Sequence, residues 1–233
     1  GEIISQTPAS TFGWTFFWGV LWGLGGLMYG LGMRYLGMSL GNSVLLGFTS
    51  AFGALAPAVC YNFHQQAGKT TFNDLLNNSC GQLVLIGVLF CLLGIFICGK
   101  AGVLKERELS EEKKKESVKE FNLVKGLIVC IVAGILSACF NYGIEAGSKM
   151  ADVANAAWKS ANPSETGNFL YRNNVIYIVL LWGGLTTNLI WCLFLNIRNR
   201  SFGDYTDKKT PLLRNYLFCA LAGTLWFLQF FFY

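Results

Sequence analysis

A small set of polar side chains lies within the long apolar runs of this 233-residue sequence. The most prominent are Tyr29, Asn141, Glu145, Asn188 and Gln229. A polar group in hydrocarbon costs free energy unless it finds a partner, so such residues normally face the interior of a helix bundle or a water-filled cavity. They are therefore the first candidates for binding a ligand.

Tryptophans accompany these polar residues in the same apolar runs. An aromatic face can stack on the C–H surface of a neutral sugar, while a few amides and hydroxyls fix the orientation of the ring. The candidate sugar-binding residues are Trp22, Tyr29, Asn141, Asn188, Trp226 and Gln229. For each of them an alternative interpretation stays open, namely hydrogen bonding between helices for the polar groups and anchoring at the membrane interface for the tryptophans.

Glu145 is the one carboxylate that adjoins the core of an apolar run, and it follows Asn141 by a single helical turn. Partial removal from water favours the protonated form of a carboxylate, so Glu145 is our candidate for binding and releasing a proton during transport. The alternative is a solvated carboxylate that pairs with Lys149, on the next turn. The sequence leaves both roles open.

Motifs of enzymes and of nucleic-acid-binding proteins are absent from the sequence. His64 is the only histidine, which excludes an HExxH motif, and no glycine-rich phosphate loop precedes a lysine. The net charge of +5 is not arranged as a basic stripe with stacking aromatics. The eight cysteines contain no CxxC pair and are interpreted as small apolar residues. We expect no enzyme activity, nucleic acid, metal or cofactor.

Six apolar segments must position the candidate residues. Only 13% of the residues are charged, about half of the share in an ordinary soluble domain. Each segment is long enough to cross a hydrocarbon core of ~30 Å as a helix. The predicted spans are 12–33, 41–62, 82–99, 123–143, 174–196 and 215–233. The sequence thus predicts an all-α membrane protein, a polytopic transmembrane helix bundle forming a single transmembrane domain over residues 1–233.

The distribution of basic residues predicts the orientation of the chain. Of the 18 lysines and arginines, 14 lie in or beside the three alternate connections 34–40, 100–122 and 197–214. Positively charged connections tend to stay on the cytoplasmic side. We therefore place these three inside, including the charged loop 100–122, and place 63–81, 144–173 and the N-terminus outside.

Glycines in the first span recur at intervals of four residues, Gly19 with Gly23 and Gly26 with Gly30. Small residues on one face allow two helix backbones to approach closely in a membrane, where no hydrophobic effect drives helices together. This spacing predicts close helix packing along the first span.

Several short motifs follow one another in order over nearly the whole chain. They are Trp22-Gly23, Tyr29-Gly30-Leu31, Met33-Arg34-Tyr35-Leu36-Gly37-Met38-Ser39, Leu104-Lys105-Glu106-Arg107, Glu120-Phe121-Asn122-Leu123, Lys125-Gly126-Leu127 and Leu228-Gln229-Phe230-Phe231-Phe232-Tyr233. In these motifs the chain resembles the L-rhamnose–proton symporter family of the drug/metabolite transporter superfamily. The resemblance implies ten helices in all, so that this chain is an internal fragment holding roughly the third to the eighth.

The resemblance also implies a function, the import of L-rhamnose or a similar deoxysugar by proton symport across the bacterial cytoplasmic (inner) membrane. The partners would be the lipid bilayer, the sugar and protons. A transporter of another small metabolite in the same superfamily and a non-transporting membrane scaffold or receptor are the alternatives. Because the family pattern has a neutral residue in place of Glu145, the coupling role of that carboxylate is inferred from this sequence alone.

Overall fold

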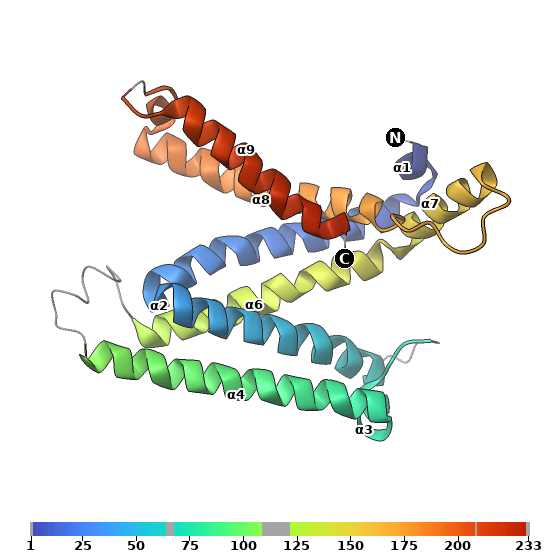
Figure 1. Ribbon diagram of the computed structural model, residues 1–233, viewed down its shortest axis with the longest axis horizontal. Coiled ribbons are helices and arrows are strands. Elements are labelled where there is room, and N and C mark those ends of the chain that lie inside the picture. The colour runs from blue at the N-terminus through green and yellow to red at the C-terminus, as the bar shows by residue number, and fades with distance from the viewer. Residues whose placement is uncertain (1, 64–67, 109–121, 208, 232–233) are drawn as a thin grey trace. The chain divides into compact units, whose positions relative to one another are not determined.

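The computed structural model describes residues 2–63, 68–108, 122–207 and 209–231, and all regular elements in these ranges are helical (Figure 1). The predicted all-α class is confirmed. The elements are α1 (Glu2–Gln6), α2 (Ala9–Phe63), α3 (Phe72–Asn77), α4 (Ser79–Glu108), α6 (Leu123–Ala146), α7 (Ser148–Ala161), α8 (Asn174–Asn199), η1 (Phe202–Thr206), α9 (Leu212–Leu228) and η2 (Gln229–Phe231). Of the predicted charged loop 100–122, the first part continues α4, and residues 109–121 lie outside the described ranges.

Four helices in the described part of the chain are long and apolar enough to cross a membrane. They are Ala9–Phe63, Ser79–Ala101, Leu123–Ala146 and Asn174–Asn199. The first holds two of the predicted spans, and the sixth predicted span coincides with α9 and η2 up to residue 231. The chain is thus a multi-pass membrane protein, and the number of six crossings stays a prediction.

The 55-residue helix α2 consists of two helical halves separated at Gly37. This residue has φ 77° and ψ 167°. Such a positive φ lies outside the helical region and is readily adopted only by glycine. The chain reverses here, because Tyr29 and Asn42, which precede and follow the turn, are joined by a hydrogen bond. The predicted connection 34–40 is therefore reduced to a turn at one residue.

The chain divides into two compact units, which we describe separately. The central unit comprises Leu21–Tyr142, and the terminal unit comprises Gly1–Val20 together with Gly143–Tyr233. The single transmembrane domain expected over residues 1–233 stays a prediction.

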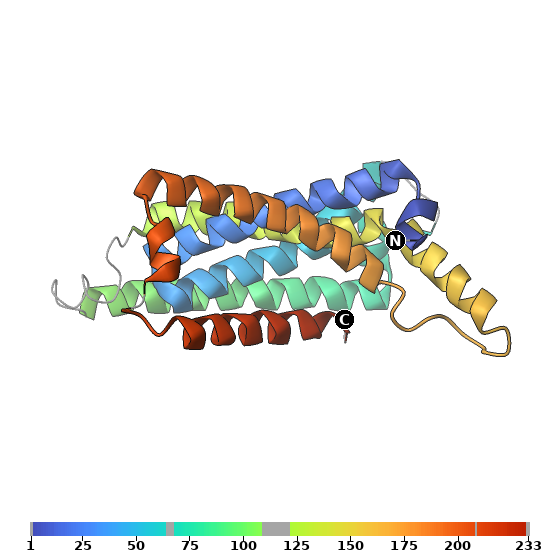
Figure 2. The same cartoon turned by 90° about the horizontal axis from the view of Figure 1, so that it is seen from above.

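Apolar side chains of α2 and α6 form the core of the central unit. Its buried members are Leu36, Leu40, Val44, Leu45, Cys130 and Ala133. Glycines bring the helices close together here, because a Cβ at Gly32 would overlap Sγ of Cys130, and a Cβ at Gly47 would overlap the side chain of Ile95. Helix α4 accordingly lies alongside the second half of α2 (Figures 1 and 2).

In the terminal unit, α2 and α8 cross with their backbones in contact. A Cβ at Gly19 would overlap the carbonyl oxygen of Leu180, and a Cβ at Gly183 would overlap the carbonyl oxygen of Phe16. Any larger residue at either position would push the two helices apart. Gly19, one of the glycines in the regular spacing of the first span, is thus a true helix contact.

The other glycines of that pattern behave differently. Around Gly26 and Gly30 nothing lies within 4 Å of the place where a Cβ would stand. Gly25, which the spacing did not single out, instead packs against α6, where a Cβ would be 3.0 Å from the backbone nitrogen of Ser137. Glycine spacing therefore predicts only in part which face of the helix packs against a neighbour.

Helix α7 provides much of the core of the terminal unit, although it lies within residues 144–173, which the sequence predicts to be a connection outside the membrane. The buried members of this core are Met150, Ala151, Ile176 and Val179, with Phe12, Phe16, Ile144 and Val175 packed around them. The helix is amphipathic, because Met150, Ala151 and Ala154 are buried while its other face is polar and largely exposed.

Candidate functional site

The first group of candidate residues lies in the central unit, where both halves of α2 meet α6. The ring of Trp22 packs against Phe140 with a centroid distance of 5.3 Å and an interplanar angle of 59°. The amide of Asn141 lies beside Gly53 on the second half of α2, where a Cβ would be only 3.2 Å from Nδ2. Phe140 and Asn141 are consecutive on α6 but contact different halves of α2, the first half through Trp22 and the second through Gly53.

Sequence reasoning identified Trp22 and Asn141 but missed Phe140 and Gly53. Phe140 precedes Asn141, so the aromatic–amide pair in the sequence was a usable signal. The pairing of Phe140 with Trp22 joins two helices that are far apart in the chain, and nothing in the periodicity of either segment indicates it.

Tyr29, the third candidate in the central unit, has a structural role. Its hydroxyl donates a hydrogen bond to Oδ1 of Asn42 across the Gly37 turn. The ring packs against the core cluster of the same unit. This arrangement supports hydrogen bonding between helices, the alternative interpretation of Tyr29. Asn42, its partner, was not among the predicted residues.

Asn188 lies on α8 in the terminal unit, one turn beyond the glycine crossing. Its Nδ2 donates a hydrogen bond of 2.8 Å to the carbonyl oxygen of Gly184 on its own helix. The neighbouring Thr187 instead reaches α2, where its Oγ1 donates to the carbonyl oxygen of Val20 at 3.1 Å. Thr187 therefore connects the two helices, and Asn188 stays half-buried beside this connection.

Trp226 and Gln229 come together at the C-terminal end of α9. Nε2 of Gln229 donates a hydrogen bond of 2.8 Å to the carbonyl oxygen of Trp226. The Trp226 ring meets Phe230 edge to face, with centroids 5.2 Å apart, and Phe230 packs on Tyr177 of α8 at 5.0 Å. Phe230 is buried and fixes this end of α9, whereas Trp226 and Gln229 themselves are exposed. Sequence reasoning missed Tyr177 and Phe230.

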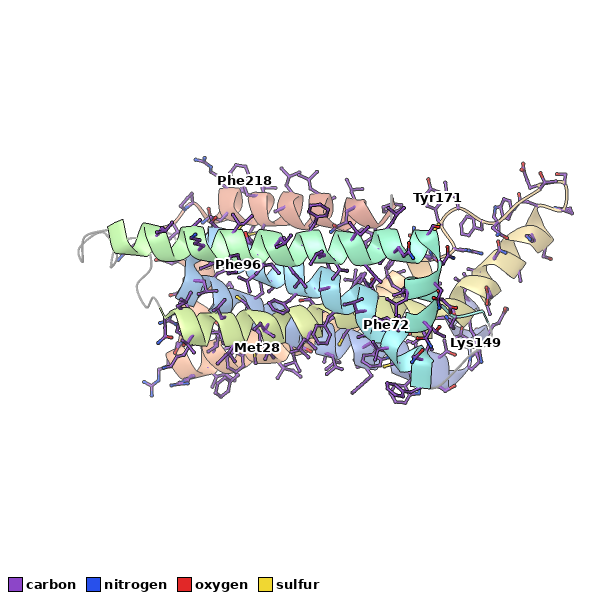
Figure 3. The ribbon with its side chains drawn as sticks, turned by 90° about the horizontal axis from the view of Figure 1, so that it is seen from below. Met28, Phe72, Phe96, Lys149, Tyr171 and Phe218 are labelled. Atoms are coloured by element: carbon purple, nitrogen blue, oxygen red, sulfur yellow. The ribbon has the colours of Figure 1, made fainter. Side chains whose placement is uncertain are left out.

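Glu145 lies half-buried on the last turn of α6, in the terminal unit. The backbone that follows is tightly held, because a Cβ at Gly147 would be 3.2 Å from Cγ1 of Ile176. Lys149, labelled in Figure 3, lies on the first turn of α7 with an exposed side chain.

The candidates thus form two groups, each within one unit. Trp22, Tyr29 and Asn141 belong to the central unit, and Glu145 belongs to the terminal unit. The terminal unit also holds Asn188, Trp226 and Gln229. Among the residues that the structure describes, no three histidine, cysteine or acidic side chains gather as the ligands of a metal ion would.

Comparison with known proteins identifies the family of this chain. The model of the family described as L-rhamnose-proton symport protein (RhaT) matches residues 3–233. Proteins named L-rhamnose-proton symporter from Yersinia pestis (strain Pestoides F) and Yersinia pseudotuberculosis (serotype O:1b, strain IP 31758) are each 36% identical to the chain over 221 residues. These alignments cover 94% of the chain and 58% of each relative, so the chain spans little more than half of their length. No solved structure matches the chain.

Proposed function

This chain belongs to the L-rhamnose-proton symport protein family, and we propose that the full-length protein imports L-rhamnose, or a similar deoxysugar, together with protons. The observation that carries the proposal is the family match over almost the whole chain. The relatives are named as symporters, which supports a transporter rather than an enzyme, a scaffold or a receptor.

The chemistry of the candidate residues supports a neutral, partly apolar substrate. In the central unit the pair of Trp22 and Phe140 offers aromatic surface, and Asn141 is exposed. The terminal unit, taken by itself, presents Trp226 and Gln229. None of these side chains carries a charge. A deoxysugar such as L-rhamnose has a methyl group and C–H faces for the rings and hydroxyls for the amides.

A proton symporter requires a membrane with a proton gradient, and we therefore propose the bacterial cytoplasmic membrane as its location. The predicted orientation, with connections 34–40, 100–122 and 197–214 inside, belongs to this proposal. A cysteine introduced at Thr206 should be labelled only from the cytoplasmic side, and one at Ser160 only from outside. The opposite accessibility would reverse the proposed orientation.

The uptake of labelled L-rhamnose by cells that express the full-length protein tests the proposed function. Accumulation is expected, and a protonophore should abolish it. Competition by unlabelled deoxysugars, tested one at a time, ranks the substrates. Uptake of a different metabolite would move the protein to another substrate class of its superfamily, and no uptake of any compound would favour a scaffold or receptor.

We further propose that Glu145 carries the transported proton. Its position on the last turn of α6, half-buried and followed by a tightly packed backbone, supports this role. Glu145→Gln should abolish accumulation driven by the proton gradient while sugar exchange across the membrane continues, because the amide keeps the shape but cannot release a proton. Normal accumulation with an unchanged pH profile would place the proton site elsewhere.

A further inference from the structure

The loop 162–173 of the terminal unit, which joins α7 to α8, rests on a firmly packed base. Helix α7 buries Met150 completely, and Ala151 and Ala154 almost completely, in the core of this unit. Ile176 and Val179 of α8 lie in the same core. Both ends of the loop are thus anchored to helices that pack on each other.

Asn155 of α7 holds the middle of this loop through both polar atoms of its side-chain amide. Its Nδ2 donates a hydrogen bond of 2.9 Å to Oδ1 of Asn168, and its Oδ1 accepts one of 2.7 Å from the backbone N–H of Phe169. Gly167, with φ 119°, allows the chain to turn immediately before these two residues. One side chain therefore sets the course of the loop.

A series of aromatic rings leads from Phe169, which Asn155 holds, to the end of α9. Phe169 stacks on Trp158 of α7 with centroids 5.9 Å apart and planes inclined by 19°. Tyr171, labelled in Figure 3, meets Phe169 edge to face at 6.1 Å and Phe231 of η2 edge to face at 5.9 Å. Phe231 in turn meets Phe227 of α9 at 5.8 Å. The aromatic series Trp158–Phe169–Tyr171–Phe231 thus joins α7 to α9.

The end of α9 that the aromatic series reaches is the part that presents Trp226 and Gln229. Phe231 contacts Tyr171, and Phe227, which contacts Phe231, lies between Trp226 and Gln229 in the sequence. Near its start, α9 is held by a 2.6 Å hydrogen bond from the Tyr216 hydroxyl to the carbonyl oxygen of Tyr205. Because most of the helix beyond this bond is exposed within the terminal unit, the position of its C-terminal end depends on the contacts made there.

We propose that Asn155 is a positioning residue, which acts through the loop 162–173 and the aromatic series to hold Trp226 and Gln229 in place for the substrate. The proposal rests on the proposed function, because it assigns these two residues to sugar binding. It adds that a loop outside the predicted spans determines the affinity of a site on a helix.

The first experiment measures the connection itself and needs no substrate. The purified full-length protein is treated with trypsin, and the fragment that ends at Arg172, within the loop, is quantified. Asn155→Leu should raise the initial rate of this cleavage by about tenfold, since cleavage follows the population of the open loop. Asn155→Asp should cleave like the original protein, because Asp can accept from Phe169 N–H and from the turned amide of Asn168.

The reciprocal variant tests whether the loop and α9 are coupled. If Tyr171 holds Phe231, then Phe231 holds Tyr171, and Phe231→Leu should also raise cleavage at Arg172 by several fold. Phe218→Leu is the matched control, since Phe218 is an exposed phenylalanine near the other end of the same helix. A normal cleavage rate in Phe231→Leu would overturn the proposed connection.

The second experiment measures transport. Asn155→Leu should raise the apparent KM for L-rhamnose by about fivefold with little change in the maximal rate, which is the pattern expected when ground-state binding is lost. Asn155→Asp should restore the original KM. Gln82→Leu is the control and should leave the KM unchanged, because Gln82 lies in the central unit, where its Nε2 donates a 2.8 Å hydrogen bond to the carbonyl oxygen of Leu76.

The two experiments separate failure of this inference from failure of the proposed function. Unchanged KM in Asn155→Leu, with the loop released, would overturn the positioning role. If the original protein transports no L-rhamnose, the proposed function fails, and the trypsin rates of Asn155→Leu and Phe231→Leu still decide whether the loop holds α9.

Discussion

Two pairs of glycines, one pair in the central unit and one in the terminal unit, bring helices together in different ways. In the central unit, Gly32 and Gly47 face the ends of side chains on neighbouring helices. In the terminal unit, Gly19 and Gly183 face backbone atoms. A side chain can turn to another rotamer, whereas a backbone can yield only if the whole helix moves. The role of a glycine in a membrane helix therefore depends on what faces it, more than on its spacing.

The largest effect is expected at the backbone crossing of the terminal unit. Gly183→Ala should destabilise the full-length protein by about 3 kcal/mol, because the new Cβ cannot fit unless α2 and α8 separate. The measurement is unfolding of the purified protein by heat or denaturant. Gly94→Ala is the control, since a Cβ there meets nothing within 4 Å, and its effect should stay below about 1 kcal/mol. Equal stabilities for the two variants would show that the crossing does not exist.

A smaller effect is expected in the central unit. Gly47→Ala should cost about 1.5 kcal/mol in the same assay, because the end of the Ile95 side chain can turn away from the new methyl group. Adding Ile95→Val, which removes the obstructing Cδ1 atom, should recover part of this loss. If Gly47→Ala destabilises as strongly as Gly183→Ala, the distinction between a glycine that faces a side chain and one that faces a backbone is wrong.

Removing a hydrogen bond between helices should destabilise the protein more when the bond is short than when it is long. Tyr29→Phe removes the hydrogen bond that the Tyr29 hydroxyl donates to Oδ1 of Asn42 across the Gly37 turn and should cost about 1 kcal/mol. Thr187→Val should cost about 0.5 kcal/mol, since its bond to Val20 is longer and its hydroxyl also lies near Gly183 O. A larger loss for Thr187→Val would place the stronger polar contact in the terminal unit.

The smallest effect concerns the starts of two short helices outside the predicted spans. Thr71 and Asp74 form a capping box at α3, and the Thr71 hydroxyl, followed by its backbone N–H, holds the pKa of Asp74 below its ordinary value of 3.8. The stabilisation is therefore present above this value and is lost as the pH falls through the lower pKa of the folded state. Helix α7 starts at Gly147 without a side-chain cap.

Hydrogen exchange measured at several pH values checks this difference between the capped start of α3 and the uncapped start of α7. Below about pH 4 the amides of α3 should lose protection earlier than those of α7, after correction for the pH dependence of intrinsic exchange. In Asp74→Asn the pH dependence at α3 should vanish. A pH dependence that persists in this variant would trace it to a different group.

Much of the fold could be predicted because apolar length alone makes a segment in lipid helical. The predicted spans 123–143 and 174–196 lie within α6 and α8. The short helices were missed because they depend on other signals. The spacing of Met150, Ala151 and Ala154 would have indicated one buried face of α7, and Thr71 followed by Asp74 would have indicated the start of α3.

The candidate site was harder to predict, because polarity does not reveal a partner. Tyr29 and Asn188 have the same kind of sequence environment, yet the first bonds across a turn and the second bonds to its own helix. The Trp22–Phe140 contact joins segments far apart in the chain, and helix phase decides whether such rings meet. A single sequence carries little information on that phase.

The turn at Gly37 has a consequence for how the protein is made. With one non-helical residue between the two halves of α2, there is no soluble linker that could wait on one side of the membrane while the second half is synthesised. In the folded chain the backbone oxygen of Tyr35 at this turn accepts a hydrogen bond from the N–H of Asn122. We therefore expect the ribosome to deliver the two halves to the bilayer as a single insertion unit, and an added segment at Gly37 would uncouple their entry.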